Sequence, residues 1–214
     1  TRRLLEILGQ LREAFPDLQR VSSYCLPRNL AKKTVEELAQ LKDAGLEILY
    51  VGMESGDDEI LRRVNKGETW ESTRSALLKI REAGLTSSVM VLNGLGGENL
   101  SRQHAINTAT LCNETQPDYL STLVVSFPQG EERFREGFGD DFVPLSQKGL
   151  FEEIRLFLEH LELDKTIFRS DHASNYLVLK GTLGRDKQKM LDQVNLAITN
   201  PGAAPLRAEW MRGL

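Results

Sequence analysis

The residues best placed to do chemistry follow a short apolar run at residues 48–51. The segment Gly52-Met53-Glu54-Ser55-Gly56 comes directly after that run, and a helix-like segment with acidic residues in its first turn follows it. The run predicts a buried strand, so Glu54 stands where a strand ends and a helix begins. In α/β sheets and barrels, ligands bind at that edge. A carboxylate there can accept hydrogen bonds from a diol such as a ribose, and Lys66, a few helical turns later, can meet a carboxylate or a phosphate.

Both residues also have a purely structural interpretation. Glu54 could cap the following helix, and Lys66 could be a solvated helix end placed before a glycine stop at Gly67. The glycines at positions 52 and 56 let the backbone turn tightly and approach a ligand. These residues alone leave the structural and the functional interpretation open.

A second polar group spans residues 168–176, at the expected end of the last strand. Arg169 and His172 are its chemically useful members: Arg169 could bind an anion and His172 could transfer a proton on the substrate side. The alternative for this group is purely structural: a hydrogen-bonded strand end that closes the bottom of a barrel of strands. His104, by contrast, is expected to pack or to cap a helix.

The composition narrows the class of protein. The 214 residues carry a net charge of -4 with no basic cluster, so nothing in the composition supports nucleic-acid binding. No apolar run approaches a membrane span, and we expect no signal peptide. The two cysteines, Cys25 and Cys112, lie far apart, which suits a reducing cytoplasm. Neither has a companion at ligand spacing, so we expect no thiolate metal site in this chain.

The chain alternates between helical and strand patterns up to residue 127. We expect helices at 2–14, from Thr34 to Gly45, at 70–83 and at 101–114, and strands at 19–24, 48–51, 88–92 and 118–126. This alternation predicts an α/β protein with parallel strands, and a partial TIM-like (β/α) barrel rather than a doubly wound open sheet. Residues 128–199 then extend and complete the barrel on its substrate side, and residues 200–214 form a loose tail. Because an amphipathic helix opens the chain without an initiator Met, we also expect the barrel to be truncated at its N-terminus.

Together these segments resemble the radical S-adenosylmethionine (radical SAM) superfamily, in its branch of Elp3-like, MiaB-like and coproporphyrinogen-dehydrogenase-like barrels. The resemblance rests on segments that occur in order between about residues 20 and 127: residues 50–56, Leu61, Asn65-Lys66-Gly67, Ala83-Gly84 and residues 91–98. No single segment is specific, but their order and spacing match. The resemblance implies a partial (β/α)6 barrel that binds a [4Fe-4S] cluster and SAM. The cofactors, with an electron donor, would perform the radical chemistry that the protein positions.

The resemblance also assigns roles residue by residue. Glu54 would meet the SAM ribose, Lys66 the SAM carboxylate, and Ser23 or Tyr24 the methionyl amino group. Met90 and Gly94 would lie along the nucleoside, although Met90 offers only apolar contact where some relatives carry an acid.

The chain departs from the family pattern in one decisive respect, because the family's three-cysteine CxxxCxxC motif is absent. We therefore expect a fragment of a radical SAM iron-sulfur oxidoreductase. In full length, that protein would cleave SAM reductively to a 5′-deoxyadenosyl radical, and the fragment would be inactive by itself. The substrate is unknown. The alternative is a stand-alone α/β nucleotide-binding module without radical chemistry.

Overall fold

A computed structural model describes residues 1–127 and 130–213 of the chain. The strands of the described part are β1 (Val21–Cys25), β2 (Leu46–Glu54), β3 (Thr86–Asn93), β4 (Tyr119–Val124), β5 (Ile167–Ser170) and β6 (Leu179–Thr182). The helices are α1 (Arg2–Ala14), α2 (Pro27–Ala31), α3 (Val35–Asp43), α4 (Asp58–Arg63), α5 (Trp70–Glu82), α6 (Gly97–Thr115), α7 (Glu132–Phe138), α8 (Gln147–His160), α9 (Leu183–Thr199) and the short 3₁₀ helix η1 (Glu209–Met211).

All six strands form one sheet, in the order β1-β2-β3-β4-β5-β6. The strands from β1 to β5 pair in parallel, and β6 pairs antiparallel to β5. Strands follow this sequential order when every crossover connection has the same hand, as in a barrel. In a doubly wound sheet, by contrast, the strand order reverses at a switch point. The structure therefore confirms an α/β fold built like part of a TIM-like barrel.

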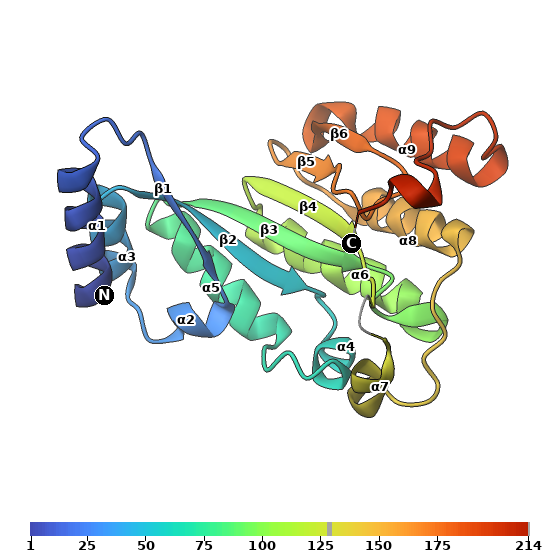
Figure 1. The fold of residues 1–214 in the computed structure, drawn as a ribbon, viewed down its shortest axis with the longest axis horizontal. Coiled ribbons are helices and arrows are strands. Elements are labelled where there is room, and N and C mark those ends of the chain that lie inside the picture. The colour runs from blue at the N-terminus through green and yellow to red at the C-terminus, as the bar shows by residue number, and fades with distance from the viewer. Residues whose placement is uncertain (128–129, 214) are drawn as a thin grey trace.

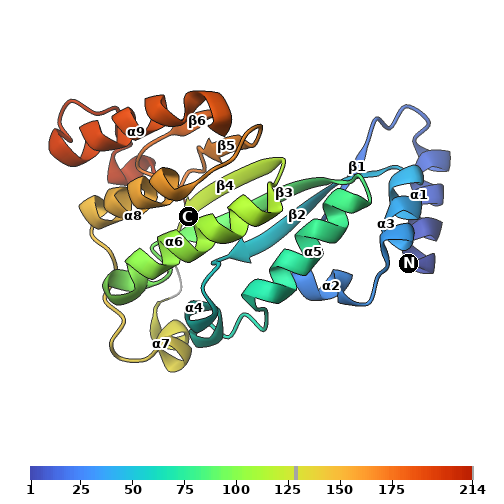
Figure 2. The ribbon, with the colours of Figure 1, turned by 180° about the vertical axis from the view of Figure 1, so that it is seen from behind.

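The helices α5 and α6 cover one face of the sheet, and in the described part of the chain no helix lies over the middle of the other face (Figures 1 and 2). Side chains alternate between these faces along each strand. On the covered face, Val51, Val89 and Leu120 are fully buried and belong to the same core as Ile80 and Leu111. Burying each such side chain stabilises the fold by roughly 1.5–3 kcal/mol. This covered core fixes the register of the strands and therefore the order in which residues appear on the open face.

Local sequence signals explain where the helices begin and end. Thr34 accepts a hydrogen bond from the backbone of Glu37, whose carboxylate accepts one from the Thr34 amide, so the two residues form a capping box. The repeated Ala-Gly-Leu pattern after α3 and α5 places Gly45 at φ 104° and Gly84 at φ 70°. Only glycine adopts that backbone readily, so both helices stop at the same point of their repeat.

Three features differ from the sequence-based expectation. Helix α2 was not expected, because Pro27 follows a strand end, but proline suits the first turn of a helix. Strand β6 is short and contains a lysine and a glycine, so its strand pattern is weak. The expectation of a loose tail is wrong for residues 200–213: Ala204 and Leu206 pack against the core, and Arg207 and Arg212 bind backbone carbonyls of residues 171–175.

Within the described residues, no helix combines the length and the apolar composition needed to cross a membrane.

Candidate functional site

The site is centred on Glu54, the last residue of β2. A register shift lies between Gly52 and Glu54, and Glu54 has φ 62°, a left-handed backbone that is unusual for a residue other than glycine. The Ser55 amide donates to the Met53 carbonyl at 2.8 Å and closes a tight turn. This bulged turn directs the Glu54 carboxylate back over the sheet instead of along the strand. Strain of this kind is concentrated at functional sites.

Lys66 comes to the same point from the segment that follows α4. Its Nζ donates to Oε1 of Glu54 at 2.8 Å, and the two side chains are 17% and 21% exposed. A Cβ added at Gly52 would lie 2.4 Å from Oε1 of Glu54 and 3.3 Å from Nζ of Lys66. The absence of a side chain at Gly52 therefore makes room for the pair on the open face. The sequence predicted both residues as ligand contacts, and the structure brings them together as an ion pair.

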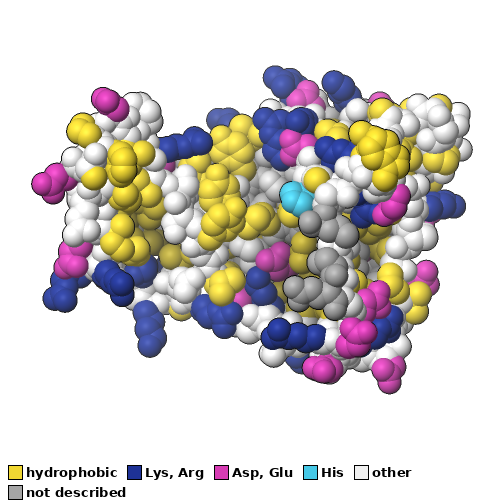
Figure 3. Space-filling model, viewed as in Figure 1, with side chains coloured by type: hydrophobic (Ala, Val, Ile, Leu, Met, Phe, Trp, Pro, Cys, Tyr) yellow, Lys and Arg dark blue, Asp and Glu magenta, His cyan; other side chains and the backbone are white. Residues whose placement is uncertain are grey.

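Tyr24 and Met90 lie on the same open face as this pair. Tyr24 is in register with Tyr50, two residues before Gly52, and the two rings stack with centroids 5.0 Å apart. Met90 is in register with Gly52 itself. Figure 3 shows this side of the molecule: hydrophobic side chains gather over the middle of the sheet, with charged side chains around them. An apolar floor with one acid and one base at its edge suits a flat, partly polar ligand.

Ser23 lies on the covered face of β1, whereas Gly94 lies at the edge of the sheet. Ser23 shares its face of β1 with Val21 and Cys25, which pack against the core, and its Oγ donates to the Tyr24 carbonyl at 3.2 Å. Of the two alternatives, Ser23 or Tyr24, only Tyr24 therefore reaches the open face. Gly94 lies in the turn after β3 at φ 89°, at the same edge of the sheet as Glu54.

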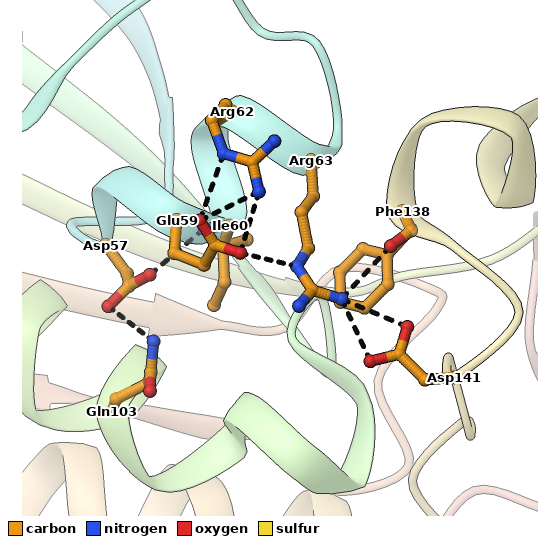
Figure 4. Close-up of polar contacts among 8 residues, drawn as sticks. All are labelled: Asp57, Glu59, Ile60, Arg62, Arg63, Gln103, Phe138 and Asp141. Atoms are coloured by element: carbon orange, nitrogen blue, oxygen red, sulfur yellow. Dashed lines mark hydrogen bonds and ion pairs between the residues drawn. The ribbon is translucent and has the colours of Figure 1, made fainter.

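The short helix α4 and its neighbours hold the segment that carries Lys66. Asp57 caps α4 by accepting from the Ile60 amide, and its second oxygen accepts from Gln103 of α6 at 3.1 Å (Figure 4). At the other end of α4, Arg63 binds Glu59, the Phe138 carbonyl and Asp141. Hydrogen bonds from Arg62 and Arg63 lower the pKa of Glu59 to about 2. Helix α4 is thereby joined to α6 and α7.

Arg169 and His172 have separate environments. Arg169 is exposed on β5 and is in register with Ser121 of β4, which is in register with Met90. It therefore shares a row of the open face with Gly52, three strands away, or about 14 Å at ~4.8 Å per strand. His172 lies beyond the end of β5, and its Nδ1 accepts from the Ser174 amide at 3.1 Å. No hydrogen bond joins Arg169 to His172 in the part of the chain that the structure describes.

The cysteines do not fit an iron-sulfur cluster. Burial raises the pKa of Cys25 to about 11 and that of Cys112 to about 12, whereas a metal ligand must be a thiolate. Within residues 1–127 and 130–213, no three His, Cys, Asp or Glu side chains lie together where they could hold a metal ion. The donor set present in this chain is therefore not that of a three-thiolate cluster.

Sequence reasoning missed one acid near the site. Glu153 of α8 is buried, and its Oε1 accepts a hydrogen bond from the Gly94 amide at 2.6 Å. A signal existed, because Glu153 stands three residues after Leu150 and four before Phe157, on the apolar stripe of an amphipathic helix. An acid on such a stripe is buried with a partner or is functional.

Comparisons with known proteins identify the family of the chain. The family model described as the radical SAM superfamily matches residues 2–109, just over half of the chain. The heme chaperone HemW of Bacillus subtilis is 26% identical over 110 residues, which cover 50% of this chain and 28% of that protein. A probable threonylcarbamoyladenosine tRNA methylthiotransferase of Methanocaldococcus jannaschii is 26% identical over 125 residues, covering 56% of this chain and 28% of that protein. The chain thus spans about 28% of the length of each of these relatives.

Solved structures show the same fold. The archaeal Methanocaldococcus infernus Elp3 superposes with a TM-score of 0.59 at 17% identity, over 83% of this chain and 42% of that one. Coproporphyrinogen III oxidase (HemN) from Escherichia coli, which its structure describes as a radical SAM enzyme, gives a TM-score of 0.58 at 22% identity, over 72% of this chain and 36% of that one. At these identities the likeness concerns the fold alone.

Proposed function

The chain belongs to the radical SAM superfamily, and we propose from this membership that its open sheet face binds SAM within a radical SAM iron-sulfur oxidoreductase. The observation that carries the proposal is the Glu54–Lys66 pair over Gly52, at the carboxyl edge of the parallel sheet. One acid and one base there match a ligand that carries both a diol and a carboxylate. The family's cofactors are SAM and a [4Fe-4S] cluster.

Each residue of the face then has a role toward SAM. Glu54 accepts hydrogen bonds from the ribose hydroxyls, Lys66 binds the carboxylate, and Tyr24 offers its hydroxyl to the methionyl amino group. Met90 gives an apolar contact, and Gly94 lets the ligand approach the backbone. The existing ion pair does not obstruct this, because its loss is offset by the contacts that both side chains make to the ligand.

The residues of this chain cannot hold the [4Fe-4S] cluster. Neither thiol of the chain fits a three-cysteine site, so we place the cluster ligands on residues other than these 214. The cofactors supply the electron transfer and the SAM cleavage, together with an electron donor to the whole protein. The chain's own residues bind and orient SAM, and by itself the chain is inactive in that reaction.

Residues 128–199 supply the substrate side in this proposal, whereas residues 1–127 supply the SAM side. Arg169 is exposed in the same row of the open face as Gly52 and Met90, so it suits an anionic group of a substrate lying beside SAM. His172 keeps only Nε2 for proton transfer, because its Nδ1 is bound to Ser174. Two free thiols suit a reducing compartment such as the cytoplasm.

The experiment uses the full-length protein, reconstituted anaerobically with iron and sulfide. Reductant-dependent conversion of SAM to 5′-deoxyadenosine is measured in the wild type, in Glu54→Ala and in Glu47→Ala, a control on the same strand whose side chain is exposed. We expect product from the wild type and Glu47→Ala, and at least a tenfold loss in Glu54→Ala. A protein that assembles no cluster and forms no product contradicts the proposal and leaves the nucleotide-binding module in its place.

A further inference from the structure

A buried polar network lies beneath the turn that carries Glu54. Ser55 follows Glu54 directly, and its Oγ lies 2.8 Å from Nδ1 of His104 on α6. Nε2 of His104 lies 3.0 Å from the carbonyl oxygen of Leu92, which can only accept a hydrogen bond. Nε2 therefore carries the proton, and Nδ1 accepts from the Ser55 hydroxyl. The Ser55 Oγ also accepts from the Asp57 amide at 3.0 Å. His104 thus joins the end of β2 to the end of β3.

Glu153 of α8 extends this network to the second turn. Its Oε1 accepts from the Gly94 amide at 2.6 Å and lies 3.9 Å from Nε2 of His104. The side chains of Glu153 and His104 are each 2% exposed. Burial raises the pKa of Glu153. Two helices therefore meet under the site through one acid and one imidazole.

A cavity of about 10 Å³ lies beside these groups, lined among others by His104, Thr122 and Glu153. In the described part of the chain, Oε2 of Glu153 and Oγ1 of Thr122 are buried and have no hydrogen-bond partner. Buried polar atoms are nearly always satisfied by protein or by ordered water. A cavity of about 10 Å³ is at the lower limit of the space that one water molecule needs, and these two atoms would be its polar partners.

We propose that Glu153, His104 and one water molecule, bound between Glu153 Oε2 and Thr122 Oγ1, form a polar bridge that positions the Glu54 and Gly94 turns relative to each other. Glu153 and His104 are positioning residues, since neither reaches the open face. The effect of the bridge on SAM rests on the proposed function, whereas the bridge itself rests on the contacts alone.

Amide hydrogen exchange tests the bridge in the 214-residue chain without any ligand. Glu153→Leu removes the acceptor of the Gly94 amide, so that amide should exchange at least tenfold faster. The Asp57 amide, held by Ser55 on the other turn, should also accelerate, because His104 loses the carboxyl group that lies 3.9 Å from its Nε2. Glu153→Gln keeps an acceptor for Gly94 and should restore both amides to within about threefold of the wild type. Glu152→Gln, an exposed neighbour on α8, is the matched control.

Two results overturn the bridge. An Asp57 amide that does not respond to Glu153→Leu shows that the two turns are independent. An equal acceleration of all core amides, not rescued by Glu153→Gln, shows ordinary loss of stability. The water is tested separately, by solving a crystal structure. We expect electron density for one water molecule within hydrogen-bond distance of both Glu153 Oε2 and Thr122 Oγ1. A cavity without such density contradicts the bound water.

A double-mutant cycle then tests the consequence for ligand binding, with SAM as the probe. Ser55→Ala and Glu153→Leu do not touch each other, yet their effects on the dissociation constant should be non-additive by more than about twofold, the usual limit for independent sites. If the chain binds no SAM, the proposed function fails while the exchange experiment still decides on the bridge. If SAM binds and the effects are additive, the bridge does not position the ligand face.

Discussion

Oε1 of Glu54 and Nζ of Lys66 lie 2.8 Å apart, directly over the Cα of Gly52. The two residues are twelve positions apart in the chain, and a bulged strand end and a short helix are both needed to bring them together. Their meeting point lies on the open face of the sheet, at the edge where parallel strands end. The account of the ligand face depends on this relationship.

Gly52→Ala should separate this pair with little effect on the fold. The new Cβ would lie 2.4 Å from Oε1 of Glu54, and the side chain's end can move away while the backbone stays in place. We expect the free energy of unfolding, measured with urea, to change by less than about 1 kcal/mol. SAM binding by calorimetry should weaken at least tenfold. Unchanged binding would show that the paired geometry is irrelevant to the ligand.

Glu54 is held in a strained backbone conformation. Replacing it with glycine should therefore relieve the strain, although it also removes the carboxylate. Glu54→Ala and Glu54→Gly both remove the ion pair, but only glycine relieves the cost of φ 62°. After the greater entropy of unfolded glycine is subtracted, Glu54→Gly should be about 0.5–1 kcal/mol more stable than Glu54→Ala in urea unfolding. Equal stabilities would mean that the turn is not strained.

A side chain added at Gly56 should destabilise the fold, whereas one added at Gly9 should not. A Cβ at Gly56 would lie 2.6 Å from the backbone of Asn107 and Thr108, and α6 cannot move away cheaply. Gly56→Ala should therefore lower the free energy of unfolding by about 1–3 kcal/mol. Gly9, in the middle of α1, has nothing within 4 Å of an added Cβ, and Gly9→Ala should raise stability by about 0.5–1 kcal/mol. The reverse order of the two variants would refute this packing.

Glu153 should make stability depend on pH. Its folded-state pKa is raised above the ordinary value of 4.5, mainly by burial, so the neutral form favours the folded state. Its contribution is complete below pH 4.5 and is lost as the pH rises through the folded-state pKa. The stability of the wild type relative to Glu153→Gln should therefore fall in urea titrations as the pH rises from 4.5 through the folded-state pKa. The stability of the wild type relative to Glu152→Gln should not change over the same pH range. An equal fall relative to both variants would contradict the assignment of the pH dependence to Glu153.

The C-terminal tail should stabilise the segment that contains His172. The Arg207 guanidinium donates to the carbonyls of Asp171, His172 and Asn175. Because hydrogen bonds from a charged group contribute more than neutral ones, Arg207→Ala should cost about 1–3 kcal/mol of unfolding free energy. Arg185→Ala, on an exposed arginine, should cost less than about 0.5 kcal/mol. Equal losses would mean that the tail does not hold this segment.

Local signals in the sequence predicted much of the fold. The capping box at Thr34, the glycines at 45 and 84 and the apolar runs depend only on neighbours in the chain, so the helices and strands that they delimit could be predicted. Strand β6 and the folded tail could not be predicted, because their stability comes from β5 and from carbonyls of residues 171–175, which are distant in sequence.

The site was predictable only in part. The strand-end position of Glu54 follows from the pattern, but its pairing with Lys66 depends on a bulge and on the left-handed backbone, which the sequence does not reveal. Ser23 and Tyr24 could not be separated without the register of β1. The partnership of Glu153 with Gly94 joins residues 59 positions apart and requires the packing of α8 under the sheet.

The most direct test of the ligand face is an NMR titration of the isotope-labelled chain with SAM. We expect saturable shifts that centre on the amides of Tyr24, Gly52, Glu54, Met90 and Gly94, and at least tenfold weaker binding in Lys66→Met than in the exposed control Lys148→Met. Absence of shifts at millimolar SAM, or shifts confined to the helix-covered face, would contradict the claim that this face binds SAM.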